Sequence, residues 1–155
     1  MNRLTFLLFL SLFFLFGCRT NRDLQSLCRD IELKYPHVQH LSNSDFLLKK
    51  DVLLIDTRQI KEYNTSHITK ALRADDKEDL LKLIHQHQKN SKPIVLYCSV
   101  GERSSYFAQW LKLEHNIETY NLKGGLFLWA NEGFPLEGGT LVHPFDQSWG
   151  RYLNK

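Results

Sequence analysis

The chain lacks the features of a small disulfide-rich protein and those of a structural metal site. Its 155 residues include only three cysteines, Cys18, Cys28 and Cys98, whereas a disulfide-stapled miniprotein carries several cysteine pairs. Seven histidines are present, but neither a CxxC nor an HExxH spacing accompanies them, and zinc sites are commonly built on such spacings. The sequence therefore predicts neither a disulfide framework nor a bound metal.

An excess of charge of one sign is also missing. The chain has 20 Lys and Arg residues against 17 Asp and Glu residues, a formal net charge of +3, and no basic cluster stands clear of acidic or apolar neighbours. Proteins that bind nucleic acid usually concentrate basic charge on one surface. We therefore expect no nucleic-acid partner, and the 43% of hydrophobic residues is typical of one globular domain.

The first seventeen residues differ from the rest of the chain. Arg3 is followed by an almost unbroken apolar run over 4–16 and then by Gly17. An export signal combines a positive start, an apolar core of about 7–15 residues and a small residue at the cleavage site. A membrane-spanning helix needs about 20 apolar residues. Residues 1–17 are therefore predicted to be a signal peptide, and the protein is expected to be exported.

The end of this signal carries a possible lipid attachment site. The residues Leu15-Phe16-Gly17-Cys18 resemble the bacterial lipobox, whose cysteine is acylated and becomes the first residue of the mature protein. The resemblance implies lipidation at Cys18 and a membrane partner at the cell envelope, on the periplasmic or the outer surface. An uncleaved N-terminal anchor and a signal cut elsewhere are alternatives, and both also keep the domain outside the cytoplasm.

Residues 18–37 are expected to form a tether and an N-terminal helix that ends before Pro36. One stripe of this helix is apolar, with the spacing i, i+3, i+4, i+7; its members are Leu24, Leu27, Cys28 and Ile31. The spacing predicts a core-facing Cys28 thiol. A disulfide between Cys28 and Cys98 is compatible with export, and the sequence leaves it open.

Beyond Pro36, short apolar runs alternate with helical stretches. This pattern is typical of an α/β domain whose mainly parallel sheet is flanked by helices. Strands are expected at 38–41, 52–55, 94–97 and 117–122; helices are expected after the cap residues 42–45, at 79–88 and at 104–115. The domain is assigned to residues 38–137. A C-terminal tail, 138–155, is expected to cover a sheet edge or a face of the core.

The chemistry is concentrated after the strand at 94–97. Ligands of open α/β sheets bind beyond the carboxyl ends of strands, and Cys98 stands at that position. N–H groups of the loop and of the next helix favour thiolate over thiol, Arg103 adds positive charge, and Gly101 permits a positive φ. We therefore predict a nucleophilic Cys98; the alternative is a buried, inert thiol. The residues expected to hold the substrate are Ser99, Val100, Gly101, Glu102, Arg103 and Ser104.

Three ordered motifs resemble the rhodanese-like family. The loop 98–104, Cys-Ser-Val-Gly-Glu-Arg-Ser, is similar to that family's CxxGxR loop followed by Ser. Upstream, Asp56-Thr57-Arg58, Glu62-Tyr63, His67-Ile68 and Ala71 resemble its first signature; downstream, Leu122-Lys123-Gly124-Gly125, Trp129 and Gly133-Phe134-Pro135 resemble its closing segment. Ser66, Thr69 and Lys70 stand where the family usually has Gly, Pro and Gly. The motifs span most of the mature chain in the correct order.

The resemblance implies a three-layer rhodanese-like fold and sulfurtransferase activity. The Cys98 thiolate would take a sulfane sulfur from a small sulfur-containing anion such as thiosulfate, or from a persulfide, and would become a cysteine persulfide. A thiol or a cyanide-like acceptor would then remove that sulfur. Arg103 would orient the donor, and no cofactor is required.

Residues at a neighbouring strand end are predicted to support the loop. Asp56, Arg58 and Glu62 fall near the candidate site, and the spacing of Arg58 and Glu62 suits an ion pair. His85 and His87, which are two residues apart on a helix, are expected to face solvent.

Two other classes of function stay open. The first is a phosphatase or arsenate reductase, since certain cell-cycle phosphatases resemble this family in fold. They place five residues between Cys and Arg; here four separate Cys98 from Arg103, and Glu102 would repel a dianion. The second class is a noncatalytic rhodanese-like binding module at the cell envelope. Loss of the cysteine would indicate such a module, and Cys98 is present.

Overall fold

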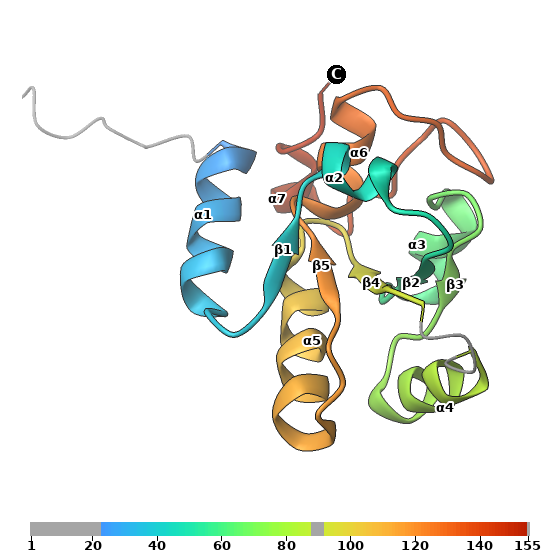
Figure 1. The fold of residues 1–155 in the computed structure, drawn as a ribbon. Helices are drawn as coiled ribbons and strands as arrows, with labels where there is room; N and C mark the ends of the chain where they lie inside the picture. Colours follow the sequence, from blue (N-terminus) through green and yellow to red (C-terminus); the bar gives the residue numbers. More distant parts are fainter. Residues whose placement is uncertain (1–22, 88–91, 155) are drawn as a thin grey trace, which may run out of the picture.

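A five-stranded, entirely parallel sheet forms the centre of the protein (Figure 1). The computed structural model describes residues 23–87 and 92–154. The strands lie in the order β1-β5-β4-β2-β3; their bounds are β1 Gln39–Leu41, β2 Leu53–Asp56, β3 Leu72–Arg73, β4 Ile94–Tyr97 and β5 Tyr120–Leu122. The expected α/β fold with a parallel sheet is confirmed, whereas the two-residue strand β3 was not expected.

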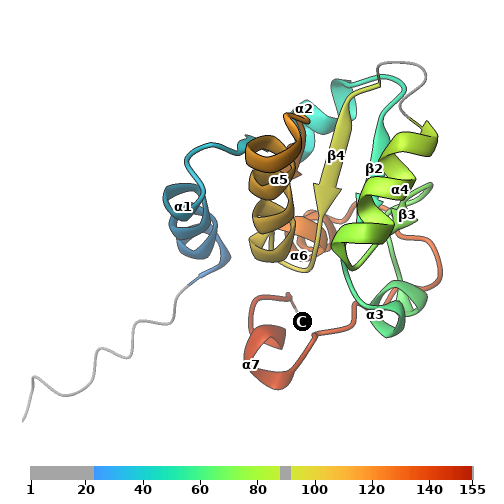
Figure 2. The same cartoon turned by 90° about the horizontal axis from the view of Figure 1, so that it is seen from below.

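Helices cover both faces of this sheet. Their bounds are α1 Leu24–Lys34, α2 Asn43–Leu48, α3 Ile60–Thr65, α4 Lys77–His87, α5 Glu102–His115, α6 Gly125–Asn131 and α7 Gln147–Gly150. Figure 2 shows α4 and α5 in front of the sheet and α2 and α6 behind it. The arrow of β4 points toward the edge of the molecule where α7 lies. The tail therefore reaches the carboxyl ends of the central strands.

The starts of α5 and β5 differ from the sequence-based prediction for local reasons. Helix α5 begins at Glu102, two residues earlier than expected, because Gly101 takes a left-handed conformation and caps the helix. Strand β5 begins at Tyr120 and not at Ile117, since the left-handed Asn116 ends α5 and the Ile117 N–H still donates to the Leu111 carbonyl. A strand can start only after the chain has left this helix terminus.

Alternating side chains of the two central strands supply two cores. Residues of β2 and β4 are all buried, as expected for strands covered on both faces. One face packs against α1, α4 and α5 through Leu53, Ile55, Ile94 and Leu96. The other face packs against α6 and the segment before β3 through Leu54, Val95 and Tyr97. Asp56 pairs with Tyr97 in the register, so the residues after β2 and β4 meet at one edge.

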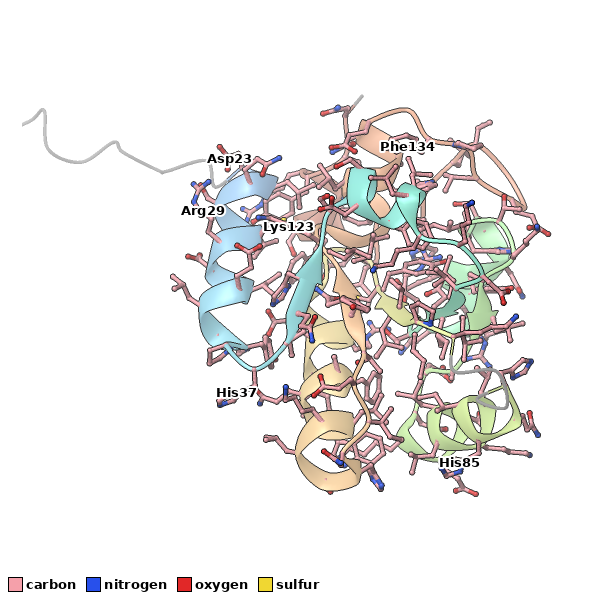
Figure 3. All side chains as sticks on the ribbon, viewed as in Figure 1. Asp23, Arg29, His37, His85, Lys123 and Phe134 are labelled. Atoms are coloured by element: carbon pink, nitrogen blue, oxygen red, sulfur yellow. The ribbon has the colours of Figure 1, made fainter. Side chains whose placement is uncertain are left out.

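The surface histidines of α4 take no part in these cores. His85 and His87 are exposed, as expected, and Figure 3 shows His85 projecting away from the sheet.

Among the residues that the structure describes, no helix is both long enough and apolar enough to cross a membrane. The predicted signal peptide and the lipidation site at Cys18 lie outside the described residues.

Cys28 is a buried core residue on α1. Its side chain is 2% exposed and packs with the core beneath α1 and α5. Burial penalises the thiolate and raises the pKa of Cys28 to about 11. Cys28 and Cys98 are both free thiols, so the disulfide that the sequence left open is not formed.

This burial predicts that Cys28 resists alkylation in the folded protein. With a pKa of about 11, only about one Cys28 thiol in a thousand is ionised at pH 8. Iodoacetamide at pH 8, followed by peptide mass spectrometry, is expected to leave Cys28 unmodified in the native state and to modify it fully in concentrated urea. Rapid native-state labelling of Cys28 would contradict the packing of α1.

Candidate active site

The Cys98 thiol lies inside a tight backbone loop at the carboxyl end of β4. The Gly101 N–H donates a hydrogen bond to the Cys98 Sγ atom over 3.2 Å. Gly101 can make this turn because its φ is +98°, a conformation that favours glycine. Its carbonyl then accepts the N–H and the hydroxyl of Ser105. The loop therefore turns around the sulfur and leads directly into α5.

The first turn of α6 holds this loop from the opposite side. Leu126 and Phe127 donate their N–H groups to the carbonyls of Cys98 and Ser99, both over 2.9 Å. The approach requires glycine at position 125, where a Cβ atom would lie 2.2 Å from the Cys98 carbonyl oxygen. With its carbonyls fixed in this way, the loop backbone keeps one orientation around the thiol.

A buried carboxylate, Glu62 of α3, connects the loop with Arg103. Glu62 is 2% exposed and accepts the Ser99 hydroxyl over 3.0 Å and the Gln59 N–H over 3.1 Å. Its Oε2 atom lies 3.6 Å from Arg103 Nη1, and the same Arg103 nitrogen donates to the Thr57 carbonyl over 3.1 Å. These partners compensate the buried negative charge and hold the Arg103 guanidinium at the site.

The prediction of an ion pair between Arg58 and Glu62 is wrong. Arg58, which is fully buried, instead forms a two-pronged pair with Asp56, with Nε–Oδ1 and Nη2–Oδ2 distances of 3.0 and 2.7 Å. The turn after β2 brings them together, because Asp56 also accepts the Arg58 backbone N–H. Burial alone would lower the pKa of Arg58, but the hydrogen bonds and charge of Asp56 outweigh it and raise the pKa. Arg58 also donates to the Ser66 carbonyl, so the pair braces the segment before β3.

A pocket of about 200 Å³ opens onto the thiol. It is lined by Cys98, Ser99, Val100, Glu102, Arg103, Phe145 and Trp149. Two of the residues predicted to hold a substrate, Gly101 and Ser104, are not among these lining residues. Gly101 shapes the loop, and the buried Ser104 donates to Asn121 Oδ1 over 2.6 Å. The sequence did not predict that Phe145 and Trp149 line this pocket, because the only signal for them was the presence of aromatic residues in the tail.

A possible cation site elsewhere has no connection with this pocket. The carboxylates of Asp75, Asp76 and Asp79 lie near one another at the start of α4. Asp75 pairs with Arg73, and Asp76 accepts the Asp79 backbone N–H. These contacts account for the cluster as an ion pair and a helix cap.

The substitution Gly125→Ala is expected to loosen the loop through a steric clash. The substitution Gly133→Ala is the control for this clash. Gly125→Ala must move the Cys98 carbonyl, whereas Gly133 also has a positive φ, of +78°, but its Cβ would meet nothing within 4 Å. Urea unfolding should show a loss of about 1–2 kcal/mol for Gly133→Ala, from the left-handed conformation alone, and a clearly larger loss for Gly125→Ala. Amide exchange at Leu126 and Phe127 should accelerate only in Gly125→Ala. Equal losses would mean that α6 does not constrain the loop.

Comparison with known proteins agrees with this fold and loop. A family model described as "Rhodanese-like domain" matches residues 19–132. A thiosulfate sulfurtransferase GlpE of Coxiella burnetii is 30% identical over 99 residues, which are 63% of this chain and 89% of that protein. A tRNA uridine(34) hydroxylase of Aster yellows witches'-broom phytoplasma is 31% identical over 133 residues, 79% of this chain, but the chain spans only 42% of that protein.

Solved structures with the same fold include two sulfur-transfer enzymes. A thiosulfate sulfurtransferase from Pseudomonas aeruginosa superimposes with a TM-score of 0.61 at 18% identity, over 83% of this chain and 26% of that chain. A polysulfide-sulfur transferase from Wolinella succinogenes gives a TM-score of 0.53 at 23% identity, over 72% and 87%. At these identities the likeness concerns the fold. The family match, which extends from 19 to 132, shows that this chain belongs to the rhodanese-like domain family.

Proposed function

We propose that this protein is a sulfurtransferase in which Cys98 carries a sulfane sulfur as a persulfide. The observation that carries the proposal is the Cys98 thiol at the end of β4, turned into a loop whose Gly101 N–H points at the sulfur. Membership of the rhodanese-like family and the similarity to a named thiosulfate sulfurtransferase support the same chemistry.

In the first step, the Cys98 thiolate attacks the terminal sulfur of the donor. A bond forms between Sγ and that sulfur, the donor's S–S bond breaks, and the leaving group departs with the bonding electron pair. With thiosulfate the products are the Cys98 persulfide and sulfite; with an organic persulfide they are the Cys98 persulfide and a thiolate. The Gly101 N–H is placed to stabilise negative charge on sulfur. Gly101 has no side chain that could cap the first N–H groups of α5.

In the second step, a thiol or a cyanide-like acceptor attacks the outer sulfur of the persulfide and regenerates the Cys98 thiolate. Arg103 lies at the pocket wall and orients the anionic end of the donor. Glu62 acts indirectly, because it accepts the Ser99 hydroxyl of the loop and pairs with Arg103. None of these steps requires a cofactor.

Phosphate and arsenate chemistry fits this pocket less well than sulfur transfer. The loop has four residues between Cys98 and Arg103, and the Glu102 carboxylate forms part of the pocket wall. A carboxylate beside a bound dianion is repulsive, which disfavours phosphate and arsenate but does not disfavour a singly charged organic persulfide. A purely noncatalytic role is also disfavoured, since the free Cys98 thiol opens onto a pocket that carries an arginine.

We also propose that the protein is exported and held at the envelope membrane through a lipid on Cys18. Support comes from the sequence alone: a short apolar run over 4–16, followed by Gly17 and Cys18. One acyl chain gives only marginal membrane binding, so durable attachment requires the several chains of bacterial lipoprotein processing.

Sulfur loading tests the assignment of Cys98. Incubation with thiosulfate or an organic persulfide is expected to add the mass of one sulfur atom to the protein. Intact-mass measurement should detect this addition in the parent chain and in Cys28→Ser, because Cys28 is buried in the core, but not in Cys98→Ser. Loading that persists in Cys98→Ser would exclude Cys98 as the carrier, and no loading from any donor would reject the activity.

Fatty-acid labelling tests the lipid anchor. Cells that express the protein should incorporate labelled fatty acid into it, and Cys18→Ala should abolish the label while Cys28→Ala retains it. The mature N-terminus should begin at position 18. Membrane retention without label, together with an N-terminal peptide from 4–17 in the mature protein, would contradict lipidation and indicate an uncleaved anchor.

A further inference from the structure

One wall of the Cys98 pocket comes from the C-terminal tail. Phe145 and Trp149 line the pocket, although both lie beyond residue 132, where the family match ends. The remaining lining residues come from the loop after β4 and from the start of α5. In Figure 2 the segment with α7 lies at the edge toward which β4 points. The tail therefore adds an aromatic surface to a site that is otherwise built from one loop.

Hydrogen bonds hold this segment on both sides of the two aromatic residues. Before them, the Ser66 hydroxyl donates to the Leu141 carbonyl over 2.7 Å. After them, the Asn131 side chain donates to the Tyr152 carbonyl over 2.7 Å, and Tyr152 is buried in the main core. A segment fixed at both ends keeps its side chains at the pocket and does not act as a loose end.

The Phe145 ring lies over the cation of the site. The centre of the ring is 5.6 Å from the Arg103 guanidinium carbon, within the range of a cation–π contact. The Phe145 backbone has a φ of +67°, which is unusual for a bulky residue. Its side chain is 44% exposed, so part of the ring is free to contact a ligand.

The charged side chains of the pocket already have partners. Arg103 contacts Glu62 and the Thr57 carbonyl. Glu102 contacts Lys34, and it accepts the Tyr35 hydroxyl over 3.1 Å. Among the described residues that line this pocket, Arg103 is the one cation, and Glu62 partly neutralises it. No described lining residue balances the second charge of a doubly charged inorganic donor. A donor with one charge and an apolar group would place its charge at the loop and its apolar part against the aromatic wall.

We infer that Phe145 and Trp149 select sulfur donors with an apolar organic group over inorganic thiosulfate, a preference that rests on the proposed sulfurtransferase activity. The donor class is organic persulfides and thiosulfonates. In the transfer, Cys98 Sγ bonds to the terminal sulfur of R–SO2–S⁻, the S–S bond breaks, and the sulfinate R–SO2⁻ leaves with the electron pair. From an organic persulfide, the leaving group is the thiolate R–S⁻.

A comparison of two thiosulfonate donors distinguishes the effect of the apolar contact from that of the sulfur-transfer reaction. Methanethiosulfonate and benzenethiosulfonate have the same charge and the same sulfane sulfur, and they differ in the group that would contact the wall. The measurement is kcat/KM for each donor with the full chain and a common thiol acceptor. The ratio of the two values is independent of the fraction of active protein, so partial misfolding of a variant does not alter it.

The parent chain should favour benzenethiosulfonate over both methanethiosulfonate and thiosulfate. Phe145→Ala should reduce the ratio of benzene to methane donor by about tenfold, which corresponds to about 1.4 kcal/mol, and Trp149→Ala should reduce it in the same direction. Tyr106→Ala is the matched control: Tyr106 is an aromatic residue of similar exposure, 47%, and it does not line the pocket. Its ratio should equal that of the parent chain.

Four results would overturn the inference. If thiosulfate is the better donor of the parent chain, or if both tail variants keep the parent ratio, the aromatic wall does not select the donor, although sulfur transfer by Cys98 stands. If Tyr106→Ala lowers the ratio as much as Phe145→Ala does, the effect is not specific to the wall. If no donor transfers sulfur, the proposed activity itself fails, and the inference fails with it.

Discussion

The contact between the loop that follows Cys98 and the first turn of α6 constrains the rest of the site. The carbonyls of Cys98 and Ser99 accept N–H groups of Leu126 and Phe127, so backbone approaches backbone with no side chain between. Only glycine at position 125 permits this distance. Because β4 ends and α5 begins within the same loop, the contact fixes the positions of one strand and two helices relative to the thiol.

Buried charges extend this constraint to the neighbouring strand end. Glu62 joins Ser99 of the loop to Arg103, and Asp56 joins Arg58 to the turn after β2. Removing one partner of such a pair leaves a buried charge without compensation, which commonly lowers the free energy of unfolding by about 3–5 kcal/mol. The parallel register places these residues together, since Asp56 lies opposite Tyr97, the residue before Cys98. The site is therefore rigid where the sulfur is held.

The pocket around the thiol combines two parts of the chain with different roles. The loop supplies the Cys98 sulfur, the Gly101 N–H and the Arg103 cation, which in the proposed reaction would serve any donor of sulfane sulfur. The tail supplies the rings of Phe145 and Trp149, which contribute apolar surface and no reacting group. In the proposed reaction this division would separate chemistry from selectivity, because the tail can differ without any change in the groups that would contact the transferred sulfur.

The sequence by itself determined the parallel α/β fold, the strand before Cys98 and the composition of the loop. Those features follow from local patterns: a short apolar run predicts a buried strand, and the residues after it follow in the chain. Only the tertiary structure decided that Arg58 pairs with Asp56 and not with Glu62, and that Phe145 and Trp149 line the pocket at Cys98. Spacing along a chain says which residues can share a helix face, but it does not say which turns and distant segments the packed core brings together.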